Sequence, residues 1–211
     1  MTSYRTAAGP GTAEYEDKHS RFIGHVRPVS SEAEAKAFIE EIRREHADAT
    51  HNVYAYLLRE GNVLRWSDDG EPGGTSGQPT LSVLQGAGLT DVCCVTTRYF
   101  GGILLGSGGL VRAYSNAARL ALAAAGTARM TPWQKGAFAC SYSQYDRLRR
   151  FLEDRGARIE NAAFGAEVEI VFSAPESQCE SIGAALRDVT AGAVEVRPGA
   201  TVFRPVREEE A

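Results

Sequence analysis

Apolar residues recur along the first 126 residues at spacings that predict both helices and strands. Ser31 and Glu34 have the spacing of a capping box, and apolar residues then recur on one helical face, which predicts a helix from Ser31 to about His46. A second, longer helix with the same periodicity is expected to end at Gly126. Strands are expected at 22–29, 53–58, 63–66 and 92–100, and a short helix at about 80–85.

The pattern begins again after Gly126 in a different order. Two helices are expected, the first capped by Ser143 and the second preceded by Ser173 and Glu176, which repeat the capping-box spacing. Strands are expected at 133–142, 158–164, 167–172 and within 193–205. The resulting β-α-β-β-α-β order is that of a ferredoxin-like domain.

The change of pattern predicts an α+β protein with two domains, an N-terminal one at 1–129 and a C-terminal one at 130–211. The 211 residues are 43% hydrophobic and 24% charged, which is typical of a globular protein longer than one minimal domain. No run approaches the roughly 20 apolar residues that cross a bilayer, and the start lacks a secretion signal. We therefore expect a cytoplasmic protein that does not associate with membranes. The formal net charge of −4 excludes a protein that coats nucleic acid through its overall charge.

Glycine is concentrated in two polar runs, 67–79 and 97–112, each of which links an expected strand to a helix. In the second run glycines permit close backbone approach, the helix start offers unpaired N–H groups, and Arg98 and Arg112 carry positive charge, so an anion would be stabilised there. The run matches neither a Walker loop nor a dinucleotide fingerprint. On glycine content alone, a structural turn is about as good an interpretation as a phosphate site.

The first run carries three carboxylates, at Asp68, Asp69 and Glu71. They could hold a hard cation such as Mg²⁺. Alternatively, Asp68 and Asp69 start a turn and Thr75 or Ser76 caps the next helix, which is the interpretation that we favour. No residue set has the spacing of a metal site, so neither a metal nor a cofactor is expected. No nucleophile, base and orienting group occur together, which leaves open whether the protein is an enzyme.

Longer motifs in the same two runs resemble a known family. These motifs are Asp68 to Pro72 with Gly74 and Thr75, and Arg98 to Gly102 continuing from Gly106 to Tyr114; Ser20 to Phe22 and Ala49 to Tyr56 fit the earlier blocks. In these residues the chain resembles the IMPACT family, specifically its bacterial YigZ-type members. Position 104 departs from the pattern, because Leu stands where many relatives carry Lys.

The resemblance implies an N-terminal β-α fold of the ribosomal-protein type, shared with the GHMP kinases, and a C-terminal ferredoxin-like domain similar to late domains of elongation factor G. It also implies a link to translation, because eukaryotic relatives regulate translation by competing for the activator of a starvation-responsive kinase. We therefore expect a non-enzymatic binding or regulatory protein that contacts RNA, the ribosome or a translation-associated protein. The alternative is an enzyme acting on a phosphorylated small molecule or nucleotide.

The expected site is a glycine-rich, anion-binding cleft where the two runs meet. Its candidate anion- or partner-binding residues are His51, Asp68, Asp69, Glu71, Thr75, Arg98, Tyr99, Gly101, Gly102, Gly106, Gly108, Gly109, Arg112 and Tyr114. The open sheet of a ferredoxin-like domain can also bind RNA through stacked aromatic residues, but the segment 197–207 offers only Phe203. This argues against sequence-specific RNA recognition by the second half. The oligomeric state is left open.

Overall fold

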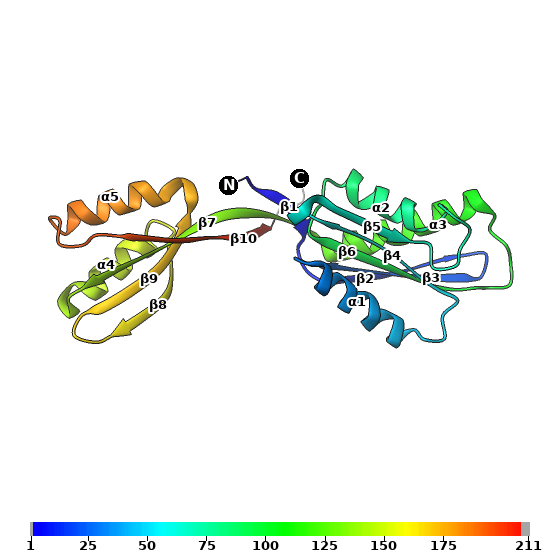
Figure 1. Ribbon diagram of the computed structural model, residues 1–211, viewed down its shortest axis with the longest axis horizontal. Coiled ribbons are helices and arrows are strands. Elements are labelled where there is room, and N and C mark those ends of the chain that lie inside the picture. Colours follow the sequence, from blue (N-terminus) through cyan, green and yellow to red (C-terminus); the bar gives the residue numbers. More distant parts are fainter. Residues whose placement is uncertain (1, 208–211) are drawn as a thin grey trace. The chain divides into compact units, whose positions relative to one another are not determined.

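The computed structural model describes residues 2–207 and divides the chain into two compact units, Tyr4–Arg129 and Met130–Arg204 (Figure 1). Both units combine helices with an antiparallel sheet, so the predicted α+β class with two domains is confirmed. Within residues 2–207 no helix combines the length and the hydropathy that a membrane span requires.

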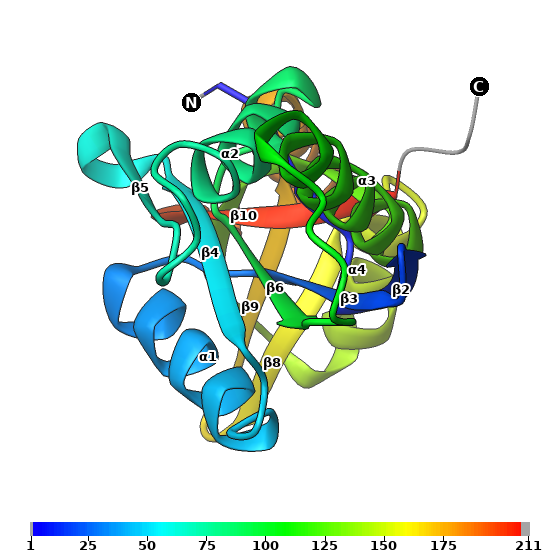
Figure 2. The ribbon, with the colours of Figure 1, turned by 90° about the vertical axis from the view of Figure 1, so that its right-hand side faces the viewer.

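The first unit is a sheet covered by helices on both faces. Its elements are β1 (Tyr4–Ala7), β2 (Gly11–Asp17), β3 (Ser20–Pro28), α1 (Glu32–Glu45), β4 (His51–Leu58), β5 (Val63–Ser67), α2 (Gly77–Gly86), β6 (Val92–Tyr99) and α3 (Ser107–Ala125). The strand order is β2-β3-β6-β4-β5, and every neighbouring pair is antiparallel. Figure 2 shows α1 on one face of the sheet and α2 with α3 on the other.

The central strand β6 is buried from Val92 to Arg98 because helices cover both faces of the sheet. Cys93 and Val95 pack toward α1, whereas Val92 and Cys94 pack toward α2 and α3. The two adjacent cysteines therefore point to opposite faces, as strand geometry requires. The edge strand β2 was not predicted, because its alternate residues are exposed and three of its seven residues are acidic, which hides the apolar pattern.

The second unit has the predicted β-α-β-β-α-β order. Its elements are β7 (Thr127–Cys140), α4 (Tyr142–Glu153), β8 (Arg158–Phe164), β9 (Val168–Pro175), α5 (Cys179–Val189) and β10 (Arg197–Arg207). The strands lie in the order β8-β9-β7-β10. Phe138, Ile170 and Phe172 on one face of this sheet pack against Leu148 of α4 and Ile182 of α5, so both helices cover that face.

The presence of each helix was predicted more accurately than the residue that caps its start. Ser31 caps α1 by accepting a hydrogen bond from the Glu34 N–H at 3.2 Å, as expected. In the second unit the cap of α4 is Ser141 instead of Ser143. Ser173 caps nothing, because β9 extends through it to Pro175 and its hydroxyl donates to Glu160 in the neighbouring strand β8.

Candidate functional site

The two polar runs meet at a cleft of about 380 Å³ in the first unit, which we call the Arg98 cleft. The start of β4, the end of β6, the loop before α2 and the first turn of α3 form its walls. The lining residues are Thr50, His51, Glu71, Pro72, Arg98, Phe100, Leu104, Leu105, Gly106, Ser107 and Leu110.

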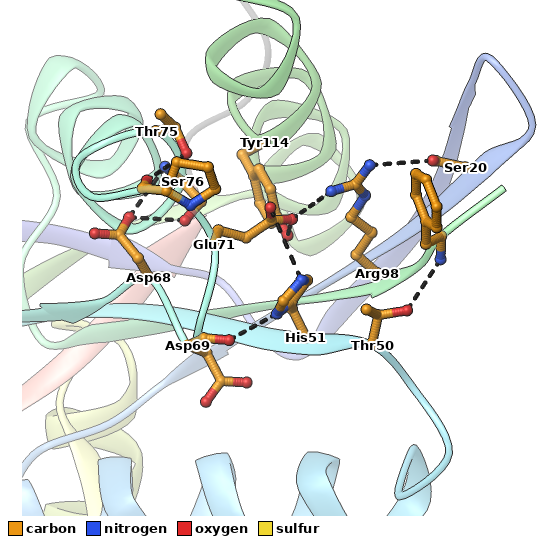
Figure 3. A network of polar contacts seen from close by, with 12 residues as sticks. Ser20, Thr50, His51, Asp68, Asp69, Glu71, Thr75, Ser76, Arg98 and Tyr114 are labelled. Atoms are coloured by element: carbon orange, nitrogen blue, oxygen red, sulfur yellow. Dashed lines mark hydrogen bonds and ion pairs between the residues drawn. The ribbon is translucent and has the colours of Figure 1, made fainter. Parts of the chain in front are cut away.

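A buried ion pair between Glu71 and Arg98 joins the two runs (Figure 3). Arg98 donates from one terminal nitrogen to Glu71 Oε1 at 2.7 Å, and the hydroxyl of Tyr114 donates to the same oxygen at 2.7 Å. Only 3% of the Glu71 side chain and 6% of the Arg98 side chain are exposed. Burial and the neighbouring Glu71 raise the pKa of the Tyr114 phenol well above its ordinary value, so this hydroxyl stays protonated and remains a donor.

Other contacts of Arg98 fix its position. Its second terminal nitrogen donates to Ser20 Oγ at 3.3 Å, and the Gly101 N–H donates to the same hydroxyl at 3.2 Å. The guanidinium carbon lies 5.4 Å from the ring centre of Phe22 and 5.3 Å from that of Phe100. Arg98 is therefore held by its neighbours on several sides, and its positive charge is matched by Glu71.

His51 presents one ring nitrogen toward Glu71. Its Nδ1 is 2.7 Å from the backbone carbonyl of Asp69, which can only accept, so Nδ1 carries a proton and donates. In the neutral ring Nε2 is then the acceptor, and it lies 3.9 Å from Glu71 Oε2. The Asp69 carboxylate has other partners: it accepts hydrogen bonds from the Asn52 N–H at 2.7 Å and from the Arg43 guanidinium at 3.1 Å.

Asp68 organises the loop that leads into α2. Its carboxylate accepts from the N–H groups of Gly74, Ser76 and Gly77 and from the Ser76 hydroxyl, at 2.7 to 3.1 Å. Thr75 donates to the carbonyl of Pro72 at 2.6 Å. These bonds satisfy N–H groups at the start of α2. The structural role that we favoured over cation binding is therefore present, but the expected cap was wrong: Ser76 occupies the cap position without a capping side-chain bond, and the Asp68 carboxylate takes that role.

Asp68→Asn is expected to destabilise the protein at neutral pH and to lose that effect in acid. Burial opposes ionisation of Asp68, but hydrogen bonds from Gly74, Gly77 and Ser76 outweigh it and lower the pKa of this carboxyl. A depressed pKa in the folded state stabilises the fold above the unfolded pKa of about 3.9 and loses this contribution as pH falls through the folded value. Urea unfolding of both proteins at neutral pH and below pH 4 measures the difference, and an equal gap at every pH would contradict the prediction.

The remaining candidate residues divide between the cleft and other places. Gly106 lines the cleft, while Gly108 and Gly109 lie in the first turn of α3 and Arg112 is exposed on the same helix. Gly101 and Gly102 form the bend that follows β6. Tyr99 is not in the cleft, because it follows Arg98 in the strand and its hydroxyl meets His46 and Asp48 instead.

Ser20, Thr50 and the apolar wall of the cleft were not among the candidate site residues, although Ser20 and Thr50 lie in the earlier motifs that carry the resemblance. Thr50 accepts a hydrogen bond from the Phe100 N–H at 3.1 Å and so ties the start of β4 to the second run. Ser20 starts β3, whose register places the neighbouring Phe22 opposite Arg98. Their place in the motifs was a signal for both residues, but their contacts with Arg98 and Phe100 follow only from the pairing of β3, β4 and β6.

No metal ligand set accompanies these carboxylates. Within residues 2–207, no group of three or more His, Cys, Asp or Glu side chains is arranged to hold a metal ion. The cleft offers a ring acceptor at His51, N–H groups at the first turn of α3 and a largely apolar wall. This chemistry fits a ligand or a protein segment that inserts an apolar group beside a few polar atoms.

Family models match both units. The Impact N-terminal domain matches residues 18–122, and the Domain of unknown function (DUF1949) matches residues 138–193. A solved structure described as a crystal structure of an hypothetical protein is 36% identical with a TM-score of 0.63, and the alignment covers 93% of this chain and 97% of that one.

Curated bacterial relatives align with more than nine-tenths of the chain. IMPACT family member YigZ of Escherichia coli is 36% identical over 93% of this chain and 98% of its own length. IMPACT family member YvyE of Bacillus subtilis is 33% identical over 96% and 94%. Protein IMPACT of Xenopus laevis is 35% identical over 43% of this chain and 30% of its own length. With full-length relatives above 30% identity and both domains matched, the chain belongs to the IMPACT family.

Proposed function

We propose that this protein is a non-enzymatic binding protein that regulates translation, and that a translation-associated protein binds over the Arg98 cleft. Membership of the IMPACT family fits a translation-related regulatory role. The choice of a protein partner over the ribosomal RNA or another RNA at this cleft comes from the chemistry of the cleft itself.

The observation that carries this proposal is an exposed apolar rim beside the cleft. Leu104 is 82% exposed, and Phe100 and Ile103 are each 44% exposed. These side chains follow one another in the loop between β6 and α3, and Phe100 and Leu104 also line the cleft. Clustered apolar side chains on a surface loop mark a protein interaction site, because isolated exposed apolar residues are ordinary but contiguous ones are not.

The charges in the cleft favour a protein over a polyanion. The positive charge of Arg98 is matched by Glu71 at 2.7 Å, so the pair offers a phosphate little net attraction. The groups that could still attract an anion are Arg112 and the N–H groups at the first turn of α3. The sequence predicted that the charge of Arg98 would add to them. A partner segment that places an apolar side chain between Pro72 and Leu110 needs no such charge.

The test is affinity capture from a bacterial lysate with the wild-type protein and Leu104→Asp. The wild-type protein should retain a translation-associated protein, and that partner, once purified, should bind to it in calorimetry. Leu104→Asp should weaken this binding about tenfold or more, because a charge would have to be buried in the interface. Leu120→Asp is the matched control, since Leu120 is 44% exposed on α3 and does not line the cleft. Equal binding by Leu104→Asp and the wild type would reject the proposal.

A second candidate function is an enzyme acting on a phosphorylated small molecule or nucleotide. The observation that favours it is His51, whose Nε2 is an acceptor beside Glu71 and lines the cleft. Such a nitrogen is suited to accept a proton from a substrate hydroxyl. Phosphate release from a panel of nucleoside triphosphates and sugar phosphates tests it: turnover by the wild type that is lost in His51→Ala, with an unchanged melting temperature, would favour the enzyme over the binding protein.

A further inference from the structure

The sheet of the second unit has one face that carries no helix of that unit. Register places Trp133 opposite Pro175, and Lys135 opposite Ser173. On the other side of β9, Arg158 also lies opposite Ser173. These residues alternate with Phe138 and Phe172, which face α4 and α5, so they share the opposite face of the sheet.

This face concentrates positive charge. We call it the Trp133 face and define it by six residues of β7, β8, β9 and β10, namely Trp133, Lys135, Arg158, Glu160, Ser173 and Arg204. Three of these side chains are cationic and one is anionic. One carboxylate oxygen of Glu160, Oε1, accepts hydrogen bonds both from Ser173, at 2.5 Å, and from Arg204.

Two cations on the Trp133 face are available to a ligand. Neither Lys135 nor Arg158 forms an ion pair with any residue between 2 and 207. The hydrogen bond from Ser173 lowers the pKa of Glu160 against the effect of burial, and the charges of Arg204 and Lys135 add to this lowering. Lys135 thus lies close to the Glu160–Arg204 pair without a partner of its own.

The aromatic ring of Trp133 lies among these cations. The guanidinium carbons of Arg158 and Arg204 are each 5.4 Å from its ring centre, and its Nε1 donates to Thr131 Oγ1 at 3.3 Å, which fixes the orientation of the ring. Strand β10 packs closely beside Lys135 at Gly199, because a Cβ added at Gly199 would lie 3.1 Å from the Lys135 Cβ. An indole held among guanidinium groups is the combination that binds nucleic acid bases by stacking and backbone phosphates by charge.

We infer that the Trp133 face binds single-stranded RNA. Lys135 and Arg158 would contact phosphates, a base would stack on Trp133, and the Glu160 carboxylate would accept a hydrogen bond from a ribose 2′-hydroxyl, which DNA lacks. An acidic peptide would use the cations but leave Trp133 unused. RNA recognition by this unit was not expected, because Phe203 is the only aromatic residue within 197–207; the aromatic residue of this face instead lies in β7, and its cations lie in β7, β8 and β10. This surface is separate from the Arg98 cleft and does not depend on the function proposed for it.

The test measures binding of a fluorescein-labelled oligouridine to the full-length protein by anisotropy at several salt concentrations. Lys135→Glu and Arg158→Glu should each weaken binding about tenfold or more, and neutral Lys135→Gln should lower the slope of log affinity against log salt by about one. Arg150→Glu is the matched control, because Arg150 is exposed on α4 and its reversal changes the net charge equally. Leu104→Asp, at the Arg98 cleft, should bind the oligonucleotide as the wild type does.

Tryptophan fluorescence provides a second measurement. The chain has two tryptophans, so Trp66→Phe leaves Trp133 as the single emitter, and stacking of uridine should quench its emission with the same affinity that anisotropy reports. Absence of binding, unchanged Trp133 emission on binding, or an equal effect of Arg150→Glu and Lys135→Glu would each overturn the inference. Equal affinity for oligothymidine would overturn the assignment to RNA, and equal affinity for polyglutamate would overturn the assignment to nucleic acid.

Discussion

Glu71→Ala is expected to lower the free energy of unfolding by about 3–5 kcal/mol, which is the usual cost of removing one partner from a buried ion pair. The substitution leaves the guanidinium of Arg98 buried without its counter-charge, since only 6% of that side chain is exposed. It also removes the acceptor of the Tyr114 hydroxyl, which is buried beside it. Urea unfolding followed by circular dichroism measures the loss.

Two controls separate burial from charge in this prediction. Replacing both partners, as Glu71→Leu with Arg98→Leu, should recover much of the loss, because buried ion pairs exchanged for apolar residues are often neutral in stability. Glu14→Ala breaks the exposed pair with Arg21 and should change the melting temperature little. If Glu71→Ala unfolds at the same urea concentration as the wild type, the Glu71–Arg98 pair does not stabilise the first unit.

The helices and strands of both units were largely predictable because each follows from a local pattern. Each unit offers a clear case: in the first the long helix ends at Gly126 as expected, and in the second the strand expected at 158–164 appears with those limits. Two features were not predicted correctly. The cap of α4 is Ser141 and not Ser143, and the edge strand β2 was missed. In these cases tertiary pairing decides, and no local spacing records it.

The candidate site was predictable in its location but not in its internal chemistry. Asp68, Asp69 and Glu71 look equivalent in the sequence, yet the first caps α2, the second bonds β4 and Arg43, and the third pairs with Arg98. Each role depends on the direction in which a side chain leaves a tight loop, including the left-handed backbone of Asp69 at φ 45°. The anion site expected around Arg98 needed an unpaired guanidinium, and 27 residues separate Arg98 from the carboxylate that pairs with it.

Gly101, in the bend that follows β6, approaches the β2–β3 turn so closely that it is expected to tolerate no side chain. A Cβ at Gly101 would lie 2.0 Å from the carbonyl carbon of His19 and 2.5 Å from the Ser20 nitrogen. Because both are backbone atoms, no side chain can move aside. Gly101→Ala is therefore expected to destabilise the protein by about 3 kcal/mol or more, at the upper end of the cost of overpacking.

Gly101→Ala should also weaken ligand binding at the Arg98 cleft, because moving this bend breaks the bond from the Gly101 N–H to Ser20, which in turn positions Arg98. Two nearby glycines isolate the steric cause. Gly102 has φ 84° and open space around its Cβ position, so Gly102→Ala should cost only the left-handed strain of about 1–2 kcal/mol. Gly73 has open space and no positive φ, so Gly73→Ala should cost nothing. Thermal unfolding should rank the three variants in that order, and equal melting temperatures for Gly101→Ala and Gly73→Ala would show that the bend gives way freely and does not hold Arg98 in place.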